Sequence, residues 1–331
     1  MIGALDIALD TSAAGAHWRL TTTGGPGNAA WVVGRRAEEA IRLIPRVFNL
    51  CSAAHAEAAR GALGLSSGTA APDGLLARQE RRRDHAVSIL CDWPSILGSQ
   101  PDRTALKGLA GGSDQAMQAL RRHLLGGEID LANATTGEVD RWLVAQASPT
   151  ARLLAHVRAT VDPAWGRAEL AAPQPADIAA ALEAGFPTEP RETTVADYWR
   201  AAPVLREFHA REGASLFVRM LARLLDLLSC LGAGRLRADP VSSPGGGIGI
   251  ARAARGLLAH RARLADGIVA DYRVLSPSAW NLAAGGLLQS MLAALPMGTR
   301  TPMLARLVVS CVNPCVPVTL RLGAMEGVHH A

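Results

Sequence analysis

Residues 215–233 read SLFVRMLARLLDLLSCLGA, the most apolar long stretch of the chain. Three charged residues interrupt it, Arg219, Arg223 and Asp226, at the spacing i, i+4 and i+7. This spacing places all three on one face of an α-helix and leaves the other faces apolar. A membrane-spanning helix would instead need about 20 residues with few or no charges. The stretch therefore predicts an amphipathic helix in the core of a soluble protein, without a membrane span.

The length and composition agree with a helical core. A chain of 331 residues is long enough for one large core or two modest ones. It is 49% hydrophobic but only 4% aromatic, and it is rich in Ala and Leu, as helical globular proteins are. Helix should therefore dominate the fold.

The net charge of +5 is spread along the chain, with acids between the basic residues. The densest run, RQERRRD at residues 78–84, contains its own acids and is typical of a solvated helix face. This pattern does not favour a nucleic-acid groove. The N-terminal segment MIGALDIALD lacks the basic and apolar regions of a signal peptide.

The five cysteines are odd in number and widely spread, which does not suggest a disulfide framework. We therefore expect free thiols in a reducing cytoplasm. Their positions are Cys51, Cys91, Cys230, Cys311 and Cys315.

The order of the elements predicts an α+β fold that is mainly helical, in one domain over residues 1–331. Alternating residues and the breaker TTTGGPGN predict a β element at about 3–33. A helical body follows at about 35–232, with loops at 66–74, 98–103 and 171–177, and then a long loop at 237–250. The pair Asp266-Gly267 is the strongest hairpin signal and predicts antiparallel strands around 255–276. Helices at 285–295 and 303–312 complete the C-terminal region of about 250–331.

Two short stretches suggest a site but do not establish one. In RVFNLCSAAHAEAAR, residues 46–60, Asn49 is a plausible N-cap that would place Cys51 in the first helical turn, where a thiol pKa is lowered. His55 would lie on the same face, but taken alone the pair is better explained as a small buried cysteine beside a bonded histidine. The glycine-rich GGGIGI, residues 245–250, follows a Pro-Ser loop instead of a strand, so we expect a flexible turn and not a dinucleotide site.

Four segments taken in order resemble the motifs of the large subunit of nickel–iron hydrogenases. The family patterns are Arg-x-Cys-Gly-x-Cys-x-x-x-His, Gly-x-Gly-x-x-Glu-Ala-Pro-Arg-Gly, Pro-Ser/Thr-Thr-Trp-Asn and Asp-Pro-Cys-x-x-Cys-x-x-His. The resemblance covers about residues 34–60 and the chain from residue 247 onward. The matching residues are Arg46, Cys51 and His55; Gly247, Gly249, Ala253, Arg255 and Gly256; Pro277, Ser278, Trp280 and Asn281; Pro314 and Cys315.

The departures from these motifs fall on the metal ligands. In the family four cysteines hold nickel, and two of them bridge to an iron that carries two cyanides and one carbon monoxide. Here Phe48 and Val318 replace two of the four cysteines. Because soft nickel needs its thiolates, the resemblance implies no nickel and no hydrogenase activity.

The residues that remain suit the iron fragment, Fe(CN)2CO. The resemblance implies that Cys51 and Cys315 bind its iron, with Cys311 as an alternative second thiolate one helical turn before Cys315. It also maps Arg255 and Ser278 onto family residues that donate hydrogen bonds to the cyanides. His55 either contacts this cargo or braces the loop that holds Cys51, and the second reading is slightly preferred.

This incomplete pattern, with Asp92-Trp93-Pro94 midway, resembles the HupK/HoxV type of hydrogenase maturation accessory protein. The resemblance implies a scaffold that receives the iron fragment from HypC/HypD-type assembly proteins and passes it to the hydrogenase large-subunit precursor. One alternative is a metal-free chaperone that imitates the large subunit in order to hold assembly factors. Another is an enzyme, either a residual hydrogenase or one that uses Cys51 as a nucleophile with His55 as its base. We expect the carrier, which is not an enzyme.

Overall fold

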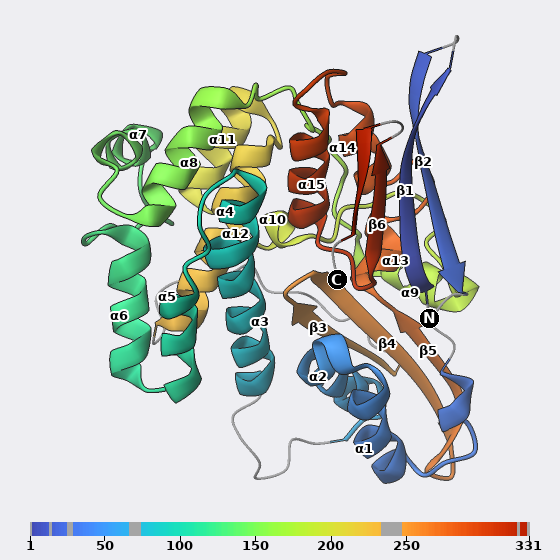
Figure 1. The fold of residues 1–331 in the computed structure, drawn as a ribbon. Helices are drawn as coiled ribbons and strands as arrows, with labels where there is room; N and C mark the ends of the chain where they lie inside the picture. Colours follow the sequence, from blue (N-terminus) through green and yellow to red (C-terminus); the bar gives the residue numbers. More distant parts are fainter. Residues whose placement is uncertain are drawn as a thin grey trace.

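The computed structural model describes residues 2–12, 15–24, 29–65, 74–232, 247–322 and 325–329. Residues 66–73 of the loop expected at 66–74, residues 237–246 of the loop expected at 237–250, and the breaker residues 25–28 lie outside these ranges. Helices form one half of the molecule and two small sheets lie in the other half, one of them carrying α1 and α2 (Figure 1). The predicted mainly helical α+β fold is confirmed.

The helical body extends from α1 to α12, close to the range expected. Two 3-10 segments, η2 and η4, and a π-helical turn, η3, lie between its helices, and a further 3-10 segment, η1, precedes α1. The bounds are α1 (Ala37–Val47), α2 (Ser52–Ala62), α3 (Leu75–Val87), α4 (Trp93–Ile96), α5 (Arg103–Lys107), α6 (Asp114–Leu125), α7 (Thr136–Ala145), α8 (Pro149–Thr160), α9 (Pro175–Ala184), α10 (Val195–Tyr198), α11 (Pro203–Glu212), α12 (Leu216–Leu231), η1 (Ala30–Val32), η2 (Asn49–Cys51), η3 (Ser88–Asp92) and η4 (Gly108–Gly111).

Helix α12 is the centre of the main core, but its charged face does not meet solvent. Arg219, Arg223 and Asp226 are all at most 4% exposed. Arg219 pairs with Glu192, while Asp226 accepts hydrogen bonds from His85 Nε2 at 2.8 Å and from Trp199 Nε1 at 3.0 Å. Buried charges persist only where partners replace water. Within the described ranges, no helix is both long enough and apolar enough to cross a membrane.

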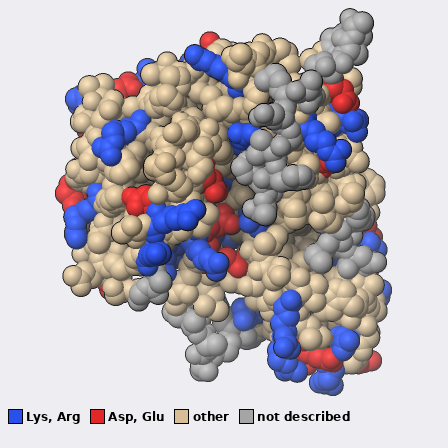
Figure 2. Space-filling model, viewed as in Figure 1, with Lys and Arg blue, Asp and Glu red and all other residues tan. Residues whose placement is uncertain are grey.

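The charged run at residues 78–84 in α3 is only partly the solvated face that was expected. Arg78 and Arg83 are exposed, but Arg81 and Asp84 are largely covered. Arg81 lies 3.3 Å from the buried Asp226, and Asp84 lies 3.2 Å from Arg255. One side of α3 therefore carries the charges that balance buried groups on other elements. On the face of the molecule that Figure 2 shows, acidic and basic side chains are interspersed.

The predicted hairpin at Asp266-Gly267 is confirmed. Strands β3 (Ile248–Ala253), β4 (Gly256–Ala265) and β5 (Ile268–Leu275) form an antiparallel sheet in the order β3-β4-β5. Asp266 and Gly267 both have positive φ, 49° and 77°, as a two-residue hairpin turn of this type requires. A second tight turn, Ala254-Arg255, joins β3 to β4 and carries Arg255 at its tip.

The N-terminal β element pairs with a C-terminal strand that the sequence did not predict. Strands β1 (Ile2–Ser12) and β2 (Gly15–Gly24) form the expected hairpin, but β6 (Val318–Leu322) adds to β1 in parallel, with Leu5 opposite Val318. Strand β7 (Met325–His329) completes a sheet in the order β2-β1-β6-β7. Helices α13 (Pro277–Asn281), α14 (Leu287–Ala293) and α15 (Thr301–Val312) precede β6. The parallel pairing fixes the segment after α15 beside the N-terminal strands.

Glycines allow helix α2 to lie directly on strand β3. A Cβ atom on Gly249 would lie 1.9 Å from the carbonyl oxygen of Ala58 and 2.5 Å from the nitrogen of Ala62. Residues 248–250 therefore belong to a strand, β3, on which α2 packs closely. The flexible turn expected for this glycine-rich stretch is wrong for these residues. This close approach sets the position of α2, which begins at Ser52 directly after Cys51 and carries His55.

We expect Gly249→Ala to lower the free energy of unfolding by about 2–3 kcal/mol, because the added methyl group forces α2 away from β3. Denaturant unfolding followed by circular dichroism measures this loss. Gly108→Ala is the matched control, since Gly108 has helical φ and no atom within 4 Å of an added Cβ, and it should stay within about 0.5 kcal/mol of the wild type. Equal stability of the two variants would contradict this packing.

Candidate functional site

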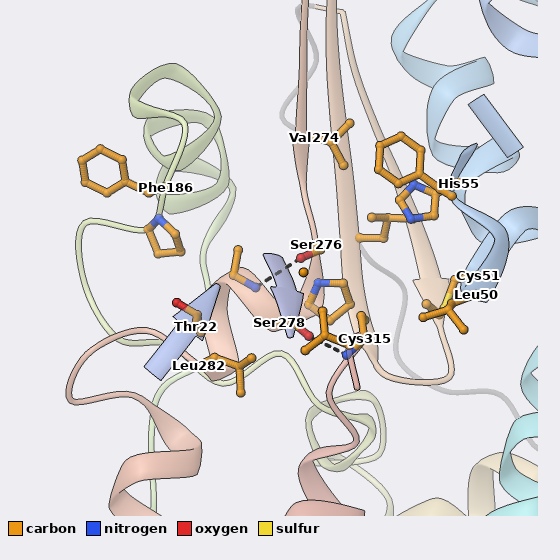
Figure 3. Close-up of a pocket in the computed structure, with 18 of the residues that line it drawn as sticks. Thr22, Leu50, Cys51, His55, Phe186, Val274, Ser276, Ser278, Leu282 and Cys315 are labelled. Atoms are coloured by element: carbon orange, nitrogen blue, oxygen red, sulfur yellow. Dashed lines mark hydrogen bonds between the residues drawn. The ribbon is translucent and has the colours of Figure 1, made fainter. Parts of the chain in front are cut away.

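A cavity of about 530 Å³ lies between α2, β5, the α13 region and the segment after α15. Figure 3 shows Cys51 and His55 on one side of it, Ser278 and Cys315 near its centre, and Phe186 on the opposite side. Among the described residues that line it there is no Asp, Glu, Lys or Arg. The cavity is therefore a largely apolar chamber in which a few polar groups stand out.

Cys51 and Cys315 both line this cavity although they lie 264 positions apart in the sequence. Their thiols are near enough that each shifts the pKa of the other, and both are free of disulfide bonds. The backbone N–H of Cys315 donates to Ser278 Oγ at 2.7 Å, which anchors the segment after α15 to α13 (Figure 3). The structure thus brings together three of the residues identified from the sequence.

The pKa values of the two thiols are shifted in opposite directions. The interaction with Cys51 lowers the pKa of Cys315 to about 6 against the effect of burial, and Arg255 and Ser278 add to the shift. The pKa of Cys51 is raised, first by the same interaction and then by burial. The two shifts favour a thiolate at Cys315 over one at Cys51.

A glutamate occupies the helix terminus that was expected to favour a Cys51 thiolate. Asn49 is not the N-cap of α2; it lies in η2, and Cys51 is the residue that precedes the helix. Glu80 of α3 accepts hydrogen bonds from the N–H groups of Ala53 and Ala54, each at 3.2 Å. Its carboxylate thus binds the free N–H groups that could have stabilised an anionic Cys51. Burial raises the pKa of Glu80.

Arg255 links Cys51 to the helical body. Its Nη1 lies 3.7 Å from Cys51 Sγ, and its Nη2 lies 3.2 Å from Asp84 Oδ2. Asp84 Oδ1 in turn accepts a hydrogen bond from Asn313 Nδ2 at 2.9 Å. Arg255 Nε is buried and has no hydrogen-bond partner in the described part of the chain. The guanidinium is thus held in place and still has one donor available.

Asp84 and Glu80 are the site residues that sequence reasoning missed. Both belong to the charged run at residues 78–84, which was predicted to be a solvated helix face. Neither lies in a segment that resembles the hydrogenase motifs. The acids within a strongly basic run were the available signal, since an acid on an otherwise basic helix face can serve a cation elsewhere in the fold.

His55 lies beside the thiol pair, braced by other side chains. Its ring stacks on Phe48 at a centroid distance of 4.2 Å, and its Nδ1 lies 2.9 Å from His260 Nε2. Burial lowers the pKa of His55 to about 3, so it is neutral at physiological pH. Phe48, which stands where the hydrogenase motif has a cysteine, thus fills space and orients His55.

Cys311 lies apart from the thiol pair. It is in α15, is packed in the main hydrophobic core and does not line the cavity. Its carbonyl oxygen accepts a hydrogen bond from Arg223 Nη2 at 3.2 Å, and burial raises its thiol pKa to about 11. The arrangement therefore favours Cys315 over Cys311 as the partner of Cys51. Across the described ranges, no three His, Cys, Asp or Glu side chains cluster as a metal site would require.

We expect Cys51→Ala to raise the pKa of Cys315 from about 6 toward the ordinary thiol value or above it, because its main stabilising interaction is lost. The pH dependence of Cys315 alkylation by iodoacetamide, read by mass spectrometry, measures this pKa. Cys230→Ala is the control, since the Cys230 thiol accepts from Arg81 and does not line the cavity. An unchanged midpoint in Cys51→Ala would show that the two thiols do not interact.

The chain matches no protein-family profile, but it is similar to individual proteins. It is 32% identical over 294 residues to the hydrogenase expression/formation protein HupK of Rhodobacter capsulatus, covering 88% of this chain and 89% of that one. It is 25% identical over 358 residues to the hydrogenase expression/formation protein HoxV of Cupriavidus necator, covering 89% and 90%.

The fold is similar to that of the nickel–iron hydrogenase large subunit. The nickel–iron–selenium hydrogenase of Desulfovibrio vulgaris Hildenborough matches with a TM-score of 0.55 at 15% identity, covering 91% of this chain and 93% of that one. At this identity the likeness concerns the fold alone. The sequence relationship goes further, because it combines 32% identity with coverage of most of both chains. The chain belongs to the HupK/HoxV family of hydrogenase expression/formation proteins.

Proposed function

We propose that this protein acts in the maturation of nickel–iron hydrogenases as a non-catalytic carrier of the Fe(CN)2CO fragment. The relatives are named hydrogenase expression/formation proteins, which supports the maturation role. The observation that carries the finer proposal is the contact between Cys51 and Cys315 in an uncharged cavity beside Arg255. In this proposal the two sulfurs bind the iron of the fragment.

The number of thiolates matches iron better than nickel. Low-spin iron with three diatomic ligands has three positions left, and two cysteines can fill two of them. The family's nickel site uses four cysteines, whereas this cavity is lined by two. Phe48 occupies one of the lost positions, and Val318 belongs to β6 and pairs with Leu5. We therefore propose a carrier without nickel.

Arg255 and Ser278 are suited to hold the cyanide ligands. Cyanide nitrogens are hydrogen-bond acceptors, and the complex becomes anionic once two thiolates bind. Arg255 does not line the cavity, but it offers a positive charge 3.7 Å from the sulfur of Cys51, which suits an anionic ligand bound there. Ser278 Oγ accepts from the backbone N–H of Cys315, and its hydroxyl lines the cavity next to that residue. The apolar remainder of the cavity suits carbon monoxide.

The cavity is larger than its proposed cargo. An iron with three diatomic ligands occupies roughly five water volumes, ~150 Å³, whereas the cavity measures about 530 Å³. The excess leaves room for a donor or acceptor protein to reach the iron. We propose that HypC/HypD-type assembly proteins deliver the fragment in the cytoplasm and that the hydrogenase large-subunit precursor receives it.

The test is infrared spectroscopy of the protein purified from cells that make the fragment. We expect cyanide and carbon monoxide stretches in the wild type and their loss in Cys51→Ala and in Cys315→Ala, because each variant removes one iron ligand. Cys91→Ala and Cys230→Ala are the matched controls, since neither thiol lines the cavity, and both should keep the bands. Bands that survive loss of Cys51 or Cys315 would disprove this site.

A complementation assay separates the carrier from a metal-free chaperone. In a strain that lacks the protein, folded Cys51→Ser and Cys315→Ser variants should fail to restore hydrogenase activity if the sulfurs carry the iron. Serine preserves the size of the side chain, so a chaperone that only holds partner proteins would be unaffected. Full restoration by both variants would favour the chaperone.

A further inference from the structure

A line of three buried side chains leads to the cavity from the sheet beside α2. His55 Nδ1 lies 2.9 Å from His260 Nε2, and His260 Nδ1 lies 2.7 Å from the hydroxyl of Tyr272. His260 belongs to β4 and Tyr272 to β5, and both are at most 3% exposed. The proposed carrier function uses neither residue. The line ends at His55, which lines the cavity.

The hydroxyl of Tyr272 sets the direction of these hydrogen bonds. In the described part of the chain its bond to His260 Nδ1 is the one hydrogen bond it makes. A buried hydroxyl must donate its proton, since an unsatisfied donor is costly. Tyr272 therefore donates to His260 Nδ1, which leaves the ring proton of His260 on Nε2. That N–H donates to His55 Nδ1, so the proton of His55 is on Nε2.

The remaining nitrogen of His55 meets the cavity. Its Nε2 makes no hydrogen bond to a described residue. Since Nε2 is absent from the fully buried polar atoms that lack a partner, it is not fully buried. Since His55 lines the cavity, Nε2 opens onto it. Stacking on Phe48, with an angle of 11° between the ring planes, limits rotation of the imidazole. Burial keeps both histidines neutral by lowering their pKa values.

We propose that His260 and Tyr272 are positioning residues that fix His55 as the Nε2–H tautomer, so that it presents a hydrogen-bond donor to an acceptor ligand in the cavity. Identifying this acceptor as a cyanide nitrogen of the iron fragment rests on the proposed function. The tautomer itself does not, because the direction of the hydrogen bonds follows from the protein alone. The reverse direction would present a lone pair to the cavity and would repel such a ligand.

Nitrogen-15 NMR of histidine-labelled, cargo-free protein reads the tautomer of His55. We expect the wild type to show the Nε2–H form alone, and Tyr272→Phe to show a second, Nδ1–H form, because the group that sets the direction is gone. The chain offers a matched control: its other tyrosine, Tyr198, is also buried and bonds the carbonyl of Ala253 instead. Tyr198→Phe should leave the His55 signals unchanged.

An Nδ1–H form in the wild type would overturn the proposal, and this result does not depend on the folding of any variant. A single unchanged Nε2–H form in folded Tyr272→Phe would also overturn it. Infrared spectra of cargo-loaded protein then test the acceptor, with a shift of a cyanide band expected in Tyr272→Phe and none in Tyr198→Phe. Loss of the carrier function would appear as absent bands in the wild type, whereas failure of this inference would leave bands that do not shift.

Discussion

The contact between the thiols of Cys51 and Cys315 is the constraint on which the site depends. It requires two unrelated packing features to coincide. Glycines let α2 lie on β3, which fixes Cys51 at the start of that helix. The parallel pairing of β6 with β1 and the bond from Cys315 to Ser278 fix the other thiol. A large fold thus positions two small groups that are remote in sequence.

The same packing determines the charge of the site. Arg255 lies next to Cys51, and the charge of Arg255 is balanced by Asp84 of α3. Helix α3 also supplies Arg81 and His85 to Asp226 of α12, so one helix serves both the core and the site. Because these groups are buried, their interactions are little screened by water or salt. This explains how a cavity lined by uncharged residues can still favour a thiolate and an anionic ligand.

The sequence predicted the parts of the fold that local patterns determine. The Asp266-Gly267 hairpin, the helix that ends near Cys315 and the apolar α12 all follow from short-range rules. The motif resemblance also identified Cys51, Cys315, Arg255 and Ser278, which the structure brings together. The parallel pairing of β1 with β6 was not predictable, since β6 has only five residues and its partner lies near the opposite end of the chain. The burial of the charges on α3 and α12 was missed for the same reason, because their partners come from distant segments.

A carrier should protect its cargo and still release it, and the site offers features suited to both. In the proposed carrier, two sulfurs and a few hydrogen-bond donors would hold the fragment, and a cavity larger than the cargo would leave access for other proteins. The most direct test of this account is iron K-edge X-ray absorption spectroscopy of the loaded wild-type protein. The account predicts two sulfur neighbours around the iron, in addition to the carbon atoms of its diatomic ligands. An iron with no sulfur neighbour, or with only one, would contradict it.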